Sequence, residues 1–214
     1  MLIQRPEIRD QRSEGFKSLQ SGSRVGTSSL RRIAQLKAIR SDLEYLDLRG
    51  NIDTRIKKLE EGKYDAIVVA YAGIKRLGLE DKITEHLNPL EILPAVGQGV
   101  LAIEIKEDDQ ETENIVLKLN DRITEITSIT ERAFLEEMQG GCQIPIGVYS
   151  EIRTNDFTLH AMVSALDGSK IIMDKITINH KEENPKNKGK LLAKNMLTNG
   201  AREILKDITE KTRI

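Results

Sequence analysis

The sequence predicts an α/β unit with a largely parallel sheet, followed by a small α+β unit with an antiparallel sheet. Its first half alternates short β-branched runs with segments of helical periodicity, the pattern of parallel strands joined by helices. Its second half carries longer alternating runs around a tight-turn signal, which is typical of antiparallel hairpins. A length of 214 residues suits two such modest units.

Residues 1–22 are polar, with alternating arginine and acid, so we expect an irregular connector there. The α/β unit is predicted over residues 23–94. Its strands are expected at 24–25, 45–48 and 66–70, the last being a continuous apolar run that suits a strand buried on both faces. Helices are expected to open after Thr27, Ser28 and Ser29 and again at Ile52.

Residues 95–120 are predicted to form a strand and a solvated tail. The strand is expected at 100–105, after a glycine-flanked turn, and the acidic stretch 107–111 is interpreted as a linker. Residues 121–214 form the predicted C-terminal unit. Ser128 and Glu131 have the spacing of a capping box, which predicts that a helix begins at 128. Strands at 157–165 and 171–178 flank the turn signal at 167–168, and an amphipathic helical tail from about 188 is broken near Gly200.

Composition excludes several classes of function. The net charge of -1, an aromatic content of 3% and the absence of tryptophan argue against nucleic-acid binding. No apolar run is long enough to span a bilayer, and no apolar signal region opens the chain, so a membrane partner is not expected. One cysteine favours a cytoplasmic, reducing location. The three histidines have no metal-ligand spacing with that cysteine, so no metal site is predicted.

The lone Cys142 follows two glycines and precedes Pro145, a pattern that predicts an exposed loop after a helix end. A thiol on such a loop could be an attachment point or a nucleophile, although no histidine accompanies it as a base. A lone cysteine is more often a small buried hydrophobe. Sequence pattern alone leaves these alternatives open.

Five arginines follow strands or open helices of the predicted parallel sheet. They are Arg31, Arg32, Arg49, Arg55 and Arg76. Because ligands bind at the carboxyl ends of parallel strands, we expect these side chains to converge on one cleft. Guanidinium groups bind carboxylates in bidentate fashion, so a substrate with several carboxylates is implied.

A simpler interpretation makes each arginine ordinary surface charge. Arg55 could pair with Asp53 or Glu60 on its own helix, at about 0.3 kcal/mol. A serine-rich helix start is usually only a cap. The joint placement of five arginines at sheet edges favours the cleft.

Six ordered motifs together resemble the porphobilinogen deaminase, or hydroxymethylbilane synthase, family over nearly the whole chain. They are VGTSSLRR at 25–32, DLRGN at 47–51, TR at 54–55, GIKRLGL at 73–79, LPAVGQG at 93–99 and the Cys142 loop. The resemblance implies head-to-tail condensation of four porphobilinogen molecules, with loss of ammonia, to hydroxymethylbilane. It also implies a dipyrromethane cofactor held by a thioether at Cys142.

By the same resemblance, the five arginines bind substrate and cofactor carboxylates. Thr27, Ser28 and Ser29 match helix-end donors to the cofactor, and Gln98 and Gly99 match an interdomain turn beside it. The family has three domains, and the catalytic aspartate belongs to the first, of which residues 95–120 resemble only the return strand and tail. No catalytic residue is therefore assigned to this chain, which is expected to be a truncated product or fragment, inactive alone and mostly without cofactor.

The full-length family is usually monomeric, whereas this fragment could self-associate through an unpaired strand edge. An alternative is a carboxylate-binding module, because the α/β half resembles a lobe of periplasmic-type binding proteins. That alternative accounts for residues 23–94 and leaves the Cys142 loop and the C-terminal unit unexplained.

Overall fold

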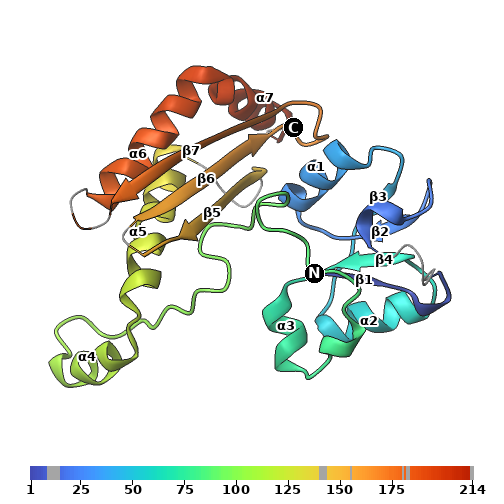
Figure 1. The fold of residues 1–214 in the computed structure, drawn as a ribbon, viewed down its shortest axis with the longest axis horizontal. Helices are drawn as coiled ribbons and strands as arrows, with labels where there is room; N and C mark the ends of the chain where they lie inside the picture. Colours follow the sequence, from blue (N-terminus) through green and yellow to red (C-terminus); the bar gives the residue numbers. More distant parts are fainter. Residues whose placement is uncertain (9–14, 140–143, 155, 180, 182–183, 213–214) are drawn as a thin grey trace.

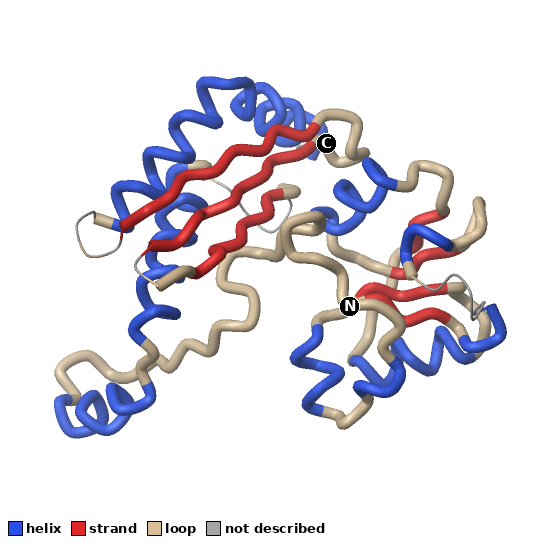
Figure 2. Tube along the Cα trace, viewed as in Figure 1, coloured by secondary structure: helices blue, strands red, loops and turns tan. Residues whose placement is uncertain are grey.

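The computed structural model describes residues 1–8, 15–139, 144–154, 156–179, 181 and 184–212. Figure 1 shows an α/β unit that contains the N-terminus and a second unit built on a separate sheet, with helix α4 projecting from the segment between them. Figure 2 shows that this intervening segment is mostly loop. Two units of the predicted classes are therefore present.

The first sheet has four strands in the order β1-β4-β2-β3. Strand β2 (Arg24–Gly26) runs parallel to both β3 (Glu44–Leu46) and β4 (Ala66–Val68). Strand β1 (Leu2–Gln4) runs antiparallel to β4 at the sheet edge. The prediction of a largely parallel sheet is confirmed.

The expected irregular connector at 1–22 is wrong at its start, where β1 is part of the sheet. Leu2 is fully buried, and its backbone exchanges hydrogen bonds with Glu85 and Thr84. Short 3-10 helices follow at Pro6–Ile8 and Phe16–Ser18. A three-residue strand carries too little periodicity to be predicted, because its pairing with β4 is decided by tertiary contacts.

Helices pack on both faces of the first sheet. Helix α1 (Leu30–Ile39) is capped by Ser29 and α2 (Ile52–Glu60) by Asn51, each side chain accepting a backbone N–H bond. Helix α3 (Tyr71–Arg76) and a 3-10 turn at Glu80–Lys82 complete the unit. The helix starts predicted after residue 29 and at residue 52 are confirmed.

The strand predicted at 100–105 is absent. Leu101 is 94% exposed, and within the described residues the backbone of 101–105 makes no hydrogen bond. A strand needs a partner to satisfy its polar groups, and none lies beside this segment. The acidic stretch predicted as a linker opens α4 (Gln110–Val116), capped by Asp109 and followed by a 3-10 turn at Leu117–Leu119. Acidic side chains are favourable in the first turn of a helix because they interact with the positive end of the helix dipole.

Helix α5 (Arg122–Glu137) begins six residues before the predicted capping box, because Asp121 caps it by accepting from the Thr124 amide. Ser128 and Glu131 therefore lie inside the helix. Three antiparallel strands follow: β5 (Ile146–Ile152), which was not predicted, β6 (Asp156–Ser164) and β7 (Ile171–Asn179). The predicted hairpin of β6 and β7 is confirmed.

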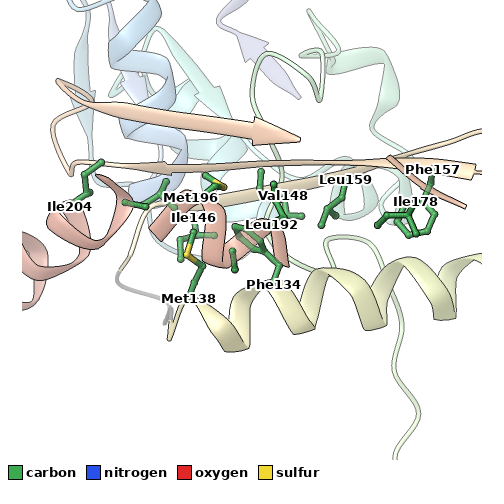
Figure 3. Close-up of a cluster of buried hydrophobic side chains, with 14 of the residues drawn as sticks. Phe134, Met138, Ile146, Val148, Phe157, Leu159, Ile178, Leu192, Met196 and Ile204 are labelled. Carbon is green, nitrogen blue, oxygen red and sulfur yellow. The ribbon is translucent and has the colours of Figure 1, made fainter. Parts of the chain in front are cut away.

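The helical tail consists of α6 (Pro185–Met196), a π-helical turn (Leu197–Ala201) and α7 (Arg202–Thr212). Gly200 has φ 104° inside that turn, which confirms the predicted break. The core of this unit lies between the helices and one face of the sheet (Figure 3), where Phe134 and Leu192 meet Val148 and Leu159. A side chain at Gly189 of α6 would lie 2.3 Å from the Thr130 carbonyl oxygen of α5, so glycine permits the close approach of the two helices.

The two units contact each other along α1 and the segment 93–97. Val148 of β5 donates a backbone hydrogen bond to Pro94 (2.9 Å). Gly168, in the β6–β7 turn at φ +76°, lies so close to α1 that an added Cβ would be 2.4 Å from the Ala34 carbonyl oxygen. The β6–β7 turn of the second sheet thus packs directly against α1.

Candidate ligand-binding site

A cleft opens at the carboxyl end of β4, where ligands bind in open parallel sheets. Its lining comes from the start of α1, the residues after β4 and the segment 87–99. One wall carries Arg31 and Arg32. The remaining lining is mostly apolar and contains no acidic side chain among the described residues: Met1, Val68, Val69, Ala70, Tyr71, Ala72, Leu87, Pro89, Ile92, Pro94, Gln98 and Gly99.

Arg31 is buried, with 8% of its surface exposed, and its guanidinium group donates to the Leu93 carbonyl oxygen. Burial, and then the nearby charge of Arg32, lower the pKa of Arg31 to about 10. The side chain is therefore still charged at neutral pH. No acidic side chain of the described chain forms an ion pair with it.

Arg32 is half-buried beside it, and one guanidinium nitrogen donates to the Val68 carbonyl oxygen at 3.0 Å. Burial, and then the charge of Arg55, lower the pKa of Arg32. Two neighbouring cations that are partly removed from water repel each other and lack a carboxylate partner in the part of the chain that the structure describes. A bound anion would relieve both costs.

The expected convergence of five arginines is observed only in part. Arg49 is exposed and forms an ion pair with Asp47 (2.8 Å), while Arg55 donates to the Gly50 carbonyl oxygen (2.8 Å). Arg76 is exposed at the end of α3. These three do not line the cleft, although Arg55 is close enough to influence Arg32. Sequence spacing does not fix the direction of each side chain, and the predicted carboxylate-binding role of these three arginines stays a prediction.

The hydroxyl groups at the start of α1 hold the local backbone. Ser28 Oγ donates to the Leu48 carbonyl oxygen (2.7 Å) and accepts from the Leu48 amide (3.0 Å), which joins the ends of β2 and β3. Ser29 caps the helix, and the buried Thr27 Oγ1 accepts from the Ser29 amide at 3.4 Å. Their predicted role as cofactor donors stays a prediction.

Gln98 and Gly99 line the cleft on a turn in which Gln98 N donates to Ala95 O (3.0 Å) and Val100 N donates to Gly97 O (3.1 Å). Gly97 and Gly99 have φ values of +66° and +87°, which residues other than glycine rarely adopt. Gln98 therefore lies at the cleft, and its predicted position beside the cofactor stays a prediction.

Tyr71 is a lining residue that sequence reasoning missed. Its ring is 38% exposed and packs against His86, with ring centroids 5.5 Å apart at a tilt of 55°. Its position directly after the buried β4 run was the signal that could have identified it, because that is the carboxyl end of a parallel strand.

Cys142 lies outside the described residues, so its predicted attachment role is not tested by the geometry. Among the residues that are described, no group of three or more histidine, cysteine or acidic side chains could hold a metal ion. None of the described helices has the length and apolar character needed to cross a membrane.

Comparisons with known proteins decide the family. Residues 1–114 match the family model described as porphobilinogen deaminase, dipyromethane cofactor binding domain, and residues 126–198 match the porphobilinogen deaminase C-terminal domain. The chain belongs to the porphobilinogen deaminase family. The first match extends from the predicted connector through the α/β unit and into the α4 segment.

Relatives named porphobilinogen deaminase are similar over most of this chain. The protein of Carboxydothermus hydrogenoformans is 48% identical over 200 residues, which are 91% of this chain and 63% of that protein. The protein of Chlorobaculum tepidum is 46% identical over 202 residues, which are 94% of this chain and 64% of that protein. This chain of the porphobilinogen deaminase family thus spans less than two thirds of the length of these relatives.

Proposed function

We propose that residues 1–214 are the part of a porphobilinogen deaminase that holds pyrrole carboxylates in the Arg31–Arg32 cleft. The whole enzyme would condense four porphobilinogen molecules head to tail, with loss of ammonia, to hydroxymethylbilane. The observation that carries this proposal is a pair of adjacent guanidinium groups lining a cleft without an acidic lining residue, in a chain of this family.

The cleft supplies two kinds of contact that a carboxylated pyrrole requires. Arg32 would pair with a carboxylate, and the partial burial of that arginine would strengthen the pairing by limiting solvent screening. Arg31 would contribute positive charge from a side chain already oriented by the Leu93 carbonyl. The apolar wall around Tyr71 and Pro89 would contact the ring face. Substrate orientation would thus come from residues of this chain.

The cleft also fits the family's dipyrromethane cofactor, because acetate and propionate groups match a cationic wall that has no acidic lining partner. The cofactor carboxylates would be held by the guanidinium groups of Arg31 and Arg32. Gln98 and Gly99 would contact the cofactor from the turn, and Cys142 would anchor it by a thioether. When bound, the cofactor serves as the primer for chain growth. Arg49, Arg55 and Arg76 would meet carboxylates farther along the growing chain.

Residues 1–214 alone are proposed to be inactive and mostly free of cofactor. Support comes from the share of the relatives' length that they span, and from the resemblance, which assigns the charge-balancing aspartate to the family's first domain. The location proposed is cytoplasmic. Turnover of porphobilinogen by these purified residues alone would contradict the proposed inactivity.

A second candidate is a general carboxylate-binding module of the periplasmic-binding-protein type, favoured by the position of the cleft at a parallel sheet edge. Calorimetric titration separates the two. A porphobilinogen site should bind porphobilinogen at least tenfold more tightly than tricarballylate, which carries three carboxylates and no ring. Equal affinities would favour the general module, and binding of neither compound would contradict both proposals.

A further inference from the structure

One acidic side chain from the C-terminal unit holds the turn that lines the cleft. Glu131, in the middle of α5, accepts a hydrogen bond from the Gly97 amide through Oε2 at 2.9 Å. Its other oxygen, Oε1, accepts from the Ser150 hydroxyl of β5 at 2.7 Å. Both carboxylate oxygens are therefore engaged, one with the cleft turn and one with the sheet behind it.

The start of this segment is fixed separately. Gln35 of α1 accepts from the Leu93 amide (2.7 Å) and donates to the Leu93 carbonyl oxygen (3.1 Å). Val148 of β5 donates to the Pro94 carbonyl oxygen (2.9 Å). These bonds fix residues 93 and 94, but they do not hold Gly97, which lies three residues later.

The turn itself has few other means of holding its conformation. Gly97 and Gly99 are both at positive φ, and an added Cβ at either position would meet no atom within 4 Å. Gln98 and Gly99 are exposed. Val96 packs on the C-terminal core, and among the described residues the hydrogen bond from Gly97 to Glu131 joins residues 95–99 to the rest of the chain.

Glu131 is well placed to act as a rigid support. It precedes Ala133 and Phe134, which are 2% and 0% exposed in the core of the C-terminal unit. Burial raises the pKa of Glu131, while its bonds to Gly97 and Ser150 act in the opposite direction. A half-buried carboxylate is costly, and these two hydrogen bonds offset part of that cost.

We propose that Glu131 is a positioning residue that fixes the 95–99 turn, and with it Gln98 and Gly99, at the wall of the Arg31–Arg32 cleft. It couples the C-terminal unit, whose helix α5 precedes Cys142 in the sequence, to the site that binds pyrrole carboxylates. This inference rests on the proposed function for its ligand, whereas the mechanical link between α5 and the turn can be measured without any ligand.

The test compares Glu131→Ala with Glu131→Gln, which keeps one acceptor for Gly97 and a donor for Ser150. Glu136→Ala, an exposed acid on the same helix, is the matched control. Amide hydrogen exchange at Gly97 is measured by NMR on residues 1–214, and porphobilinogen affinity by calorimetry. Ser150→Ala leaves the Gly97 bond in place and is the substitute for Glu131→Ala should that variant fail to fold.

We expect Gly97 exchange to accelerate about tenfold or more in Glu131→Ala and porphobilinogen affinity to fall by a similar factor, with Glu131→Gln and Glu136→Ala unchanged. Ser150→Ala should change both quantities in the same direction by less. Gly97 exchange at the wild-type rate in Glu131→Ala, or in Ser150→Ala when that variant replaces it, would overturn the proposal. So would faster exchange with unchanged affinity. Absence of porphobilinogen binding by the wild type would count against the proposed function, and the exchange rates would still decide the role of Glu131.

Discussion

Replacing Gly168 with alanine tests how the two units are joined. The residue combines a φ of +76° with a position where the new Cβ would lie 2.4 Å from the Ala34 carbonyl oxygen of α1. The left-handed conformation costs an L-residue about 1–2 kcal/mol. Ordinary contact begins at 3.4 Å, so the turn and α1 must separate by about 1 Å, an overpacking cost of about 1–3 kcal/mol. The free energy of unfolding should therefore fall by about 2–5 kcal/mol.

Gly78→Ala is the matched control, because Gly78 has a φ of +66° and no atom within 4 Å of an added Cβ. It should lose only the conformational share, about 1–2 kcal/mol. Urea unfolding followed by circular dichroism measures both variants at equal protein concentration. Equal losses in the two variants would refute the close contact between the β6–β7 turn and α1.

Three further substitutions give expectations of different kinds. Gly189→Ala should lower the free energy of unfolding in urea despite alanine's better helix propensity, because the new Cβ would lie 2.3 Å from the Thr130 carbonyl oxygen. An increase of about 1 kcal/mol in that free energy would show that α5 and α6 can separate freely. Burial raises the pKa of Asp65, but hydrogen bonds from Arg24 outweigh burial, and the pKa is lowered overall. The ionised carboxylate therefore stabilises the fold above pH 3.8, and this stabilisation is lost as the pH falls through the lower pKa of the folded state. Asp65→Asn should cost about 1.5–3 kcal/mol at pH 7 and much less at pH 2, and a pH-independent cost would contradict the pairing. Tyr71→Ala should weaken porphobilinogen binding about three- to tenfold in calorimetry with little change in unfolding free energy, since the ring is partly exposed in the cleft; unchanged affinity would remove Tyr71 from the site.

Elements with strong local signals were predicted well from the sequence. The helix after Ser29 and the hairpin at Asp167–Gly168 depend on a cap and a turn type, which neighbouring residues determine. The predictions for strand β1 and for the segment 100–105 were wrong, because strand formation there depends on a partner distant in the sequence. β1 finds one in β4, whereas 100–105 has none among the described residues.

The site was predicted to a similar extent. Arg31 and Arg32 line the cleft, as expected from the strand-to-helix order, and their role as carboxylate ligands stays a prediction. Which arginines face the cleft depends on side-chain direction, which the sequence does not determine. Glu131 was interpreted as part of a capping box, since Ser128 precedes it at the required spacing. Asp121 provides the stronger start for α5, and Glu131 is left to bond with a turn more than thirty residues earlier in the chain. Such long-range contacts have no local sequence signature.

The central claim is that the Arg31–Arg32 pair binds pyrrole carboxylates, and one titration tests it most directly. Porphobilinogen is titrated into residues 1–214, into Arg32→Gln and into Arg202→Gln, which alters an exposed arginine at the start of α7. Loss of one charge-assisted contact of about 1.5–3 kcal/mol predicts about 10- to 150-fold weaker binding for Arg32→Gln and wild-type affinity for Arg202→Gln. Equal affinity of Arg32→Gln and the wild type would contradict the account.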